Sequence, residues 1–219
     1  MPHISKEHQD YLKQEFGKMT QPVKLVYFTQ EFECQYCQIT RELLTEIADL
    51  SDRINLEIYD FVKDSEKVKQ YQVDKIPAVA VEGAYDYGIR YFGVPMGYEF
   101  SSLIEDILDV SRDSTNLSEE TKQQLKRLTK PIHIQVFITL TCPYCPAAVR
   151  MAHKMALESE MVRADMVESS EFPQLVYKYH VSAVPKVIIN ETVEFEGALP
   201  ESNYLAKVME AEGKAMVTK

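Results

Sequence analysis

The chain has 219 residues, 45% of them hydrophobic, which is enough for one large core or for two cores of roughly 100 residues each. Its 34 acidic residues outnumber its 24 basic ones, and the net charge of −10 argues against a basic surface for nucleic acid or for an anionic membrane. The polar start carries no apolar signal segment, and no stretch approaches the roughly 18 apolar residues of a membrane span. We therefore expect a soluble, cytoplasmic protein.

The first half of the chain predicts helices and strands in alternation. Ser5 is the expected N-cap of an opening helix that ends before Pro22. A buried strand over residues 23–29 follows, and then come Cys34 and Cys37 at the start of an amphipathic helix. The apolar face of that helix is formed by Ile39, Leu43, Leu44, Ile47 and Leu50.

Two more strands and two more helices are predicted before this half ends. Residues 54–61 alternate as a half-buried strand should, and residues 65–71 predict a short helix. Pro77 then opens an apolar strand, where its missing N–H indicates a special bend, such as a cis peptide bond makes. A strand at residues 88–93 and a helix at residues 96–110 follow.

The second half repeats this order. It predicts, in turn, a helix at 118–128, a strand at 132–139, Cys142 and Cys145 before a helix, a strand at 161–167, a short helix at 172–179, Pro185 before two short strands, and a helix after Pro200. Pro77 follows Cys34 by 43 positions, and Pro185 follows Cys142 by the same distance. Internal duplication is the simplest explanation and favours two cores. We place the boundary near Asn116, which gives a first unit at 1–116 and a second unit at 117–219.

The two cysteine pairs have the spacing of a redox site. If Pro143 opens the helix, Cys142 is at the N-cap, where free backbone N–H groups and the helix dipole stabilise a thiolate. Cys145 lies about one turn later on the same face, close enough to form a disulfide and less exposed. The pair can therefore attack a disulfide, form a mixed disulfide and resolve it internally. Cys34 and Cys37 hold the same places in the first unit.

Two other readings of the cysteines stay open on the sequence alone. A structural disulfide across so short a loop would constrain the unfolded chain only weakly. A zinc ion held by both pairs would make this a structural or binding protein, although zinc ribbons place their pairs about 15–20 residues apart.

The order of helix, strand, CxxC, helix, strand, short helix, strand opened by proline, strand and helix resembles the thioredoxin fold. Two such units bearing CQYC and CPYC resemble the glutaredoxin-like protein disulfide oxidoreductases of thermophilic archaea and bacteria, and TCPYCPAAVRMAHKMA, DYGIRYFGVPMGYEF and SAVPKVIIN are stretches typical of that family. The resemblance implies an α/β fold of two tandem thioredoxin-like units, each a mixed four-stranded sheet flanked by helices. It also implies a cis proline loop that faces each dithiol.

The resemblance assigns roles to particular residues. Cys34 and Cys142 would be the nucleophiles, and Cys37 and Cys145 would resolve the mixed disulfide. Contacts with the substrate are expected from the proline loops and from the residues between the cysteines: Ile76, Pro77, Val184, Pro185, Tyr36, Pro143 and Tyr144. We expect the second site to be the stronger catalyst, because its helix is predicted to open with a proline. A scaffold of this kind that binds clients without turnover is the remaining alternative.

Partners and cofactors follow from the same resemblance. Client proteins with disulfides or thiols would be the substrates, a thioredoxin reductase-like flavoprotein would supply electrons, and no cofactor or metal beyond the redox-active disulfides is expected. Many thioredoxins bury an aspartate six residues before the first cysteine, where this chain has Phe28 and Val136. The sequence therefore does not identify the group that accepts a proton from the resolving cysteine.

A few other residues have the chemistry for a functional role. His153 follows Cys145 by eight positions on a predicted helix and can face either the CxxC turn or solvent. Tyr85, Tyr87, Tyr91 and Tyr98 cluster near the end of the first unit and are predicted to pack in the core or between the units.

Overall fold

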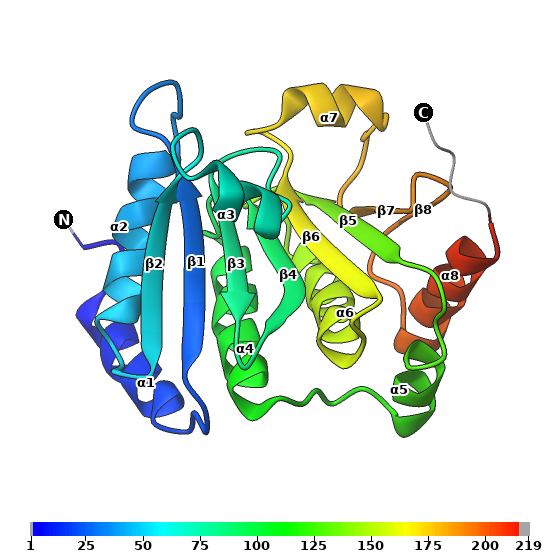
Figure 1. Ribbon diagram of the computed structural model, residues 1–219, viewed down its shortest axis with the longest axis horizontal. Helices are drawn as coiled ribbons and strands as arrows, with labels where there is room; N and C mark the ends of the chain where they lie inside the picture. The colour runs from blue at the N-terminus through cyan, green and yellow to red at the C-terminus, as the bar shows by residue number, and fades with distance from the viewer. Residues whose placement is uncertain (1, 215–219) are drawn as a thin grey trace.

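The computed structural model describes residues 2–214, which form one mixed sheet of eight strands with helices on both faces (Figure 1). The elements of the first unit are α1 (Lys6–Phe16), β1 (Val23–Thr29), α2 (Cys37–Ala48), β2 (Ile54–Asp60), α3 (Ser65–Gln70), β3 (Ala78–Glu82), β4 (Asp86–Phe92) and α4 (Glu99–Arg112). The elements of the second unit are α5 (Glu119–Leu125), β5 (Ile132–Ile138), α6 (Cys145–Glu158), β6 (Val162–Glu168), α7 (Pro173–Lys178), β7 (Lys186–Ile189), β8 (Val193–Glu196) and α8 (Glu201–Gly213).

Each unit contributes four adjacent strands with the same connections. β1 is parallel to β2 and antiparallel to β3, and β3 is antiparallel to β4. β5 has these relations to β6 and β7, and β7 is antiparallel to β8. The expected tandem pair of mixed four-stranded sheets is confirmed. Ser5 also caps α1 as predicted, because its side chain accepts a hydrogen bond from the His8 N–H.

The two units share a continuous sheet, which the sequence did not predict. The strand order is β2-β1-β3-β4-β6-β5-β7-β8, so that the outer strand of the first unit pairs with the outer strand of the second. This β4–β6 pairing is parallel and runs from Ile89 opposite Ala164 to Phe92 opposite Val167. Because β1, β4, β6 and β5 all point the same way, the loops that follow β1 and β5 emerge at the same edge of the sheet.

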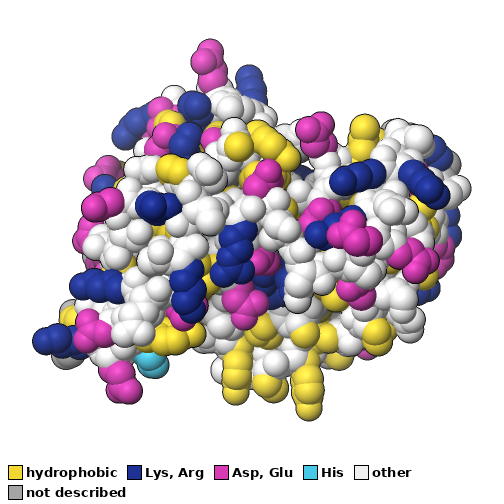
Figure 2. All heavy atoms as spheres, turned by 90° about the horizontal axis from the view of Figure 1, so that it is seen from below, with side chains coloured by type: hydrophobic (Ala, Val, Ile, Leu, Met, Phe, Trp, Pro, Cys, Tyr) yellow, Lys and Arg dark blue, Asp and Glu magenta, His cyan; other side chains and the backbone are white. Residues whose placement is uncertain are grey.

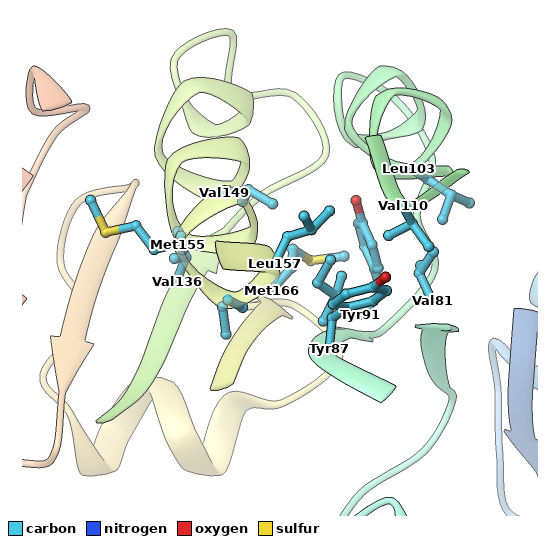
Figure 3. Close-up of a cluster of buried hydrophobic side chains, with 14 of the residues drawn as sticks. Val81, Tyr87, Tyr91, Leu103, Val110, Val136, Val149, Met155, Leu157 and Met166 are labelled. Carbon is cyan, nitrogen blue, oxygen red and sulfur yellow. The ribbon is translucent and has the colours of Figure 1, made fainter. Parts of the chain in front are cut away.

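The apolar core follows the faces of this sheet and not the units. The larger cluster underlies α1, α2, α4, α6 and α8, and the smaller one, with Phe28, Phe92 and Phe137, covers the opposite face. Figure 3 shows the centre of the larger cluster, where residues of both units meet: Val81, Tyr87, Tyr91, Leu103, Val110, Val136, Val149, Met155, Leu157 and Met166. A core for each unit was therefore the wrong expectation. Burial of such a side chain stabilises by about 1.5–3 kcal/mol, so each unit stabilises the other.

Buried polar groups lie between α4 and α6, in the same junction. His153 is fully buried, and its Nδ1 lies 2.6 Å from a carboxylate oxygen of Asp106. Tyr91 donates its hydroxyl to the same carboxylate, and Arg150 pairs with Asp106 and Asp109. Burial, aided by the nearby Arg150, lowers the pKa of His153 to about 3. The histidine therefore faces neither the CxxC turn nor solvent, and it joins the two units.

The predicted tyrosines divide between the core and the surface. Tyr87 and Tyr91 are buried at the junction, while Tyr85 and Tyr98 are 47% and 51% exposed. The face seen from below in Figure 2 carries acidic and basic side chains interspersed, without a continuous basic surface. Among residues 2–214, no helix combines the length and the apolar character that a membrane crossing requires.

Candidate active sites

Both cysteine pairs lie where a central strand passes into a helix. β1 leads to Cys34 and Cys37, and β5 leads to Cys142 and Cys145. Each pair is closed as a disulfide, with Cα–Cα separations of 5.4 Å in the first unit and 5.5 Å in the second. Because β1 and β5 are parallel, the two sites open at the same edge of the sheet.

The cysteines of each pair differ in exposure as expected. Cys142 is 8% exposed while Cys145 is completely buried. Cys34 is partly exposed and Cys37 is buried. An attacking thiolate must reach a sulfur of another molecule, and the N-terminal cysteine of each pair is the more exposed of the two.

The start of the second helix differs from the prediction. α6 begins at Cys145, with Tyr144 as its N-cap and Pro146 in its first turn, so Pro143 does not open the helix and Cys142 is not its N-cap. α2 likewise begins at Cys37, after Tyr36. The residues between the cysteines are in a turn and not in the helix. Because each helix begins at the second cysteine of its pair, the positive end of the helix dipole lies beside the disulfide, and neither N-cap side chain forms a capping hydrogen bond there.

The proline loops have the expected conformation. The peptide bonds Ile76–Pro77 and Val184–Pro185 are both cis, which confirms that prediction. In the second site, the Sγ of Cys142 lies 3.7 Å from the carbonyl oxygen of Val184. The carbonyl of each proline accepts a hydrogen bond from a glycine N–H, which ties the loop to the strand that ends the unit's sheet.

The residues between the cysteines differ in exposure between the sites. Tyr144 is 71% exposed and Pro143 is exposed as well, so both can touch a partner of the second site. Tyr36 is partly buried against the larger core cluster. In the first site Tyr27 lies beneath the helix start, where its buried hydroxyl donates to the carbonyl of Cys37 at 2.6 Å.

Glu99 is a candidate for the second site that sequence reasoning missed. It begins α4 in the first unit and is fully buried. The preceding residue, Tyr98, donates its N–H to the carbonyl of Leu140, two residues before Cys142, so this end of α4 lies beside the second CxxC loop. Burial raises the pKa of Glu99 to about 7. No local sequence pattern around the second cysteine pair indicates Glu99, because the residue belongs to the other unit.

The geometry does not favour the zinc alternative. A shared zinc ion needs four thiolates around one point, whereas each pair here forms its own disulfide. Over residues 2–214, no three His, Cys, Asp or Glu side chains lie close enough together to hold a metal ion.

Comparison with known proteins supports the assignment of the fold. The sequence profile of the thioredoxin domain matches residues 24–105 and again residues 132–210. The crystal structure of a protein disulfide oxidoreductase from Aeropyrum pernix superposes with a TM-score of 0.91 at 32% identity, over 97% of this chain and 96% of that one. The crystal structure of the N-terminal domain of the alkyl hydroperoxide reductase AhpF from Enterococcus faecalis superposes with a TM-score of 0.88 at 26% identity, over 94% of this chain and 99% of that one.

Among curated sequences, the alkyl hydroperoxide reductase AhpF of Staphylococcus aureus strain Mu50 is 30% identical over 169 residues, which are 77% of this chain and 31% of that protein. A protein named NADH dehydrogenase from Bacillus subtilis strain 168 is 25% identical over 76% of this chain and 30% of its own length. The chain thus spans about a third of these relatives. Two matches to one domain profile, in the halves that share a topology, show that the chain belongs to the thioredoxin family and consists of two tandem thioredoxin domains.

Proposed function

We propose that the protein reduces, forms or rearranges disulfides of other proteins at two CxxC sites, one in each of the units 1–116 and 117–219. It is a thiol–disulfide oxidoreductase. The observation that carries the proposal is the recurrence of one arrangement in both units: a first cysteine that is more exposed than the second, a buried second cysteine at a helix start, and a cis proline loop.

The second site illustrates the reaction. The thiolate of Cys142 attacks one sulfur of a client disulfide, forms a mixed disulfide and releases the other client sulfur as a thiolate. Cys145, after losing its proton, attacks Cys142, closes the enzyme disulfide and releases the second client thiolate. Two electrons pass from the enzyme dithiol to the client. Cys34 and Cys37 act in the same way, and the reverse sequence oxidises a client dithiol.

The proline loop orients the client for this attack. The Val184 carbonyl is 3.7 Å from the Sγ of Cys142, so a client backbone that pairs with Val184 brings its own cysteine to that sulfur. Ile76 and Pro77 would serve the first site in the same way. Tyr144 and Pro143, both exposed, extend the contact surface of the second site.

Glu99 is the proposed proton acceptor for Cys145. A buried carboxyl group with a pKa of about 7 can take a proton near neutral pH and return it in the reverse reaction. Its Oε2 accepts a hydrogen bond from the Ser102 hydroxyl at 2.7 Å, while Oε1 is buried without a partner. A free oxygen on a buried acid is suited to proton transfer.

The electron partner is proposed from the relatives. The Staphylococcus aureus relative is named as part of an alkyl hydroperoxide reductase, and the region that resembles this chain makes up 31% of its length. We propose that a thioredoxin reductase-like flavoprotein reduces the dithiols of this protein.

Reduction of insulin disulfides by dithiothreitol tests the function. The intact protein should accelerate insulin precipitation. The Cys142→Ser and Cys34→Ser variants should each lose part of this activity, while the variant with both changes should match the uncatalysed rate. An intact protein without activity, or a double variant as active as the parent, would contradict the proposal.

A further inference from the structure

The second dithiol is covered on one side by the first unit. After β4 pairs with β6, residues 93–98 cross toward the loop that precedes the second cysteine pair. Two hydrogen bonds hold the crossing segment: Val94 donates its N–H to the Glu171 carboxylate at 2.7 Å, and Tyr98 donates to the Leu140 carbonyl at 3.2 Å. The first unit of this chain therefore binds the second in two ways: its strand β4 pairs in parallel with β6, and the turn after β4 lies over the second CxxC loop.

The corresponding side of the first dithiol is open. β2 pairs with β1 alone among the described strands, so no strand pairs with its other edge, although the Asp60 N–H at its end donates to the Asp64 carboxylate. A groove of about 700 Å³, here named the β2 groove, runs between α2 and β2 and is lined by Cys34 and Cys37. Its further lining residues are Thr29, Gln30, Glu31, Gln35, Gln38, Arg41, Glu42, Ile58, Asp60, Lys63 and Asp64.

Two apolar positions, one in the β2 groove and one in the loop next to it, are exposed where their counterparts at the junction between the units are covered. Met166 of β6 is fully buried beside β4, whereas its counterpart Ile58 in β2 is 36% exposed. Leu140 lies two residues before Cys142 and packs partly buried against the core, whereas Phe32, two residues before Cys34, is 74% exposed. The repeat thus presents, beside the first dithiol, apolar side chains that another chain can cover.

The charge of the groove indicates what can cover it. Four carboxylates line it against two cations: Glu31, Glu42, Asp60 and Asp64 against Arg41 and Lys63. A second copy of this chain would have to offer one of its two edge strands: β2, which carries the same acidic groove, or β8, whose Glu194 and Glu196 are exposed. Acidic side chains would then face acidic side chains, which disfavours self-association. A basic segment of another protein is complementary.

We propose that the β2 groove docks an extended basic segment of a partner protein, which adds to β2 as a parallel strand and delivers a disulfide to Cys34. This rests on the proposed function and assigns a partner surface to the first site, on the side away from its proline loop. Strand addition supplies backbone hydrogen bonds, and the carboxylates select the charge. In the reaction, the Cys34 thiolate displaces one partner thiolate, and Cys37 then displaces the other, so that two electrons pass to the partner.

The first site can be studied alone in a parent protein with Cys142→Ser and Cys145→Ser, reduced beforehand with dithiothreitol. The probes are two short extended peptides, one rich in lysine and one rich in glutamate, each with a single cysteine joined as a disulfide to thionitrobenzoate. We expect the lysine peptide to release thionitrobenzoate about tenfold faster at low salt. The difference should shrink at about 0.5 M salt, where charges are screened. A small neutral disulfide, dipyridyl disulfide, serves as control.

A proline on the free edge tests strand addition. The N–H of Phe61 points to β1, where it donates to the Thr29 carbonyl at 2.8 Å. N–H directions alternate along a strand, so that of Ile58 points to the open edge. Ile58→Pro removes this donor without removing a hydrogen bond of the sheet. Ile58→Pro should lower the rate of reaction with the lysine peptide about fivefold and leave the rate with dipyridyl disulfide unchanged. The matched control Ile58→Val should react with the lysine peptide at the parent rate.

A charge reversal that leaves β2 intact gives an independent test. Glu31 is exposed, and Glu31→Lys should lower the rate of the lysine peptide and raise that of the glutamate peptide. Equal rates for the two peptides in the parent, or unchanged rates in both variants, would overturn the docking proposal. A dimer in sedimentation velocity that Ile58→Pro dissociates would overturn the choice of partner, because a second copy would then fill the groove. Failure of the parent to react even with dipyridyl disulfide would instead contradict the proposed function.

Discussion

Glu99→Gln should remove a pH dependence from the stability of the folded protein. Glu99 is fully buried, and burial raises its pKa from 4.5 to about 7. The folded state therefore binds the proton more tightly than the unfolded state does. Stability from this group is fully present below pH 4.5 and is lost as the pH rises through 7. Each pKa unit corresponds to about 1.4 kcal/mol, so the loss amounts to about 3 kcal/mol.

Urea unfolding of the oxidised protein from pH 4 to pH 8 measures this effect. Glutamine has nearly the same shape but no charge, so the variant should match the parent at pH 4 and exceed its free energy of unfolding by about 3 kcal/mol at pH 8. Glu7→Gln, at an exposed position of α1, is the control and should show no such divergence. A difference between parent and Glu99→Gln that stays constant across this range would refute the reasoning.

Two further predictions concern the junction of the units. Gly97 has a φ of +59°, and a Cβ there would collide with the Leu140 carbonyl, so Gly97→Ala should lower the free energy of unfolding by about 3 kcal/mol. Gly213→Ala is the control and should not destabilise, because no atom of residues 2–214 outside its own helix comes within 4 Å of a Cβ at that position. Met166→Ala leaves a cavity in the shared core and should lower the free energy of unfolding by about 2–5 kcal/mol. Circular dichroism and tyrosine fluorescence should follow the same single unfolding transition. Separate transitions for the two units would contradict a common core.

The sequence predicted those features that depend on patterns of residues close together in the chain or on the internal repeat. Strand and helix periodicity, the cysteine spacing and the recurrence of Pro77 and Pro185 after 43 positions depend on residues that are close in sequence or that repeat. These patterns predict the repeat and the two cysteine pairs, and the family resemblance that they carry implies the tandem thioredoxin-like fold and the cis prolines. The substrate-contact roles of Tyr36, Tyr144 and the proline loops stay predictions, as do the cytoplasmic location, the reductase partner and the absence of a cofactor.

What the sequence did not reveal depends on contacts between the units. The pairing of β4 with β6 turns two expected cores into clusters that run along the sheet faces, and it buries Glu99 and His153 in a junction that neither repeat contains alone. The start of α6 was misplaced for a local reason, since two prolines compete to begin it. Pro146, and not Pro143, occupies the first turn.

The most direct test of the central claim is to trap the reaction intermediate. In a protein with Cys37→Ser and Cys145→Ser, the resolving thiols are absent and a client disulfide should remain attached. Intact mass and peptide mapping after incubation with a disulfide-bonded peptide should find one adduct at Cys34 and one at Cys142, each released by dithiothreitol. A folded protein that forms no adduct at either cysteine would contradict the account of two nucleophilic dithiol sites.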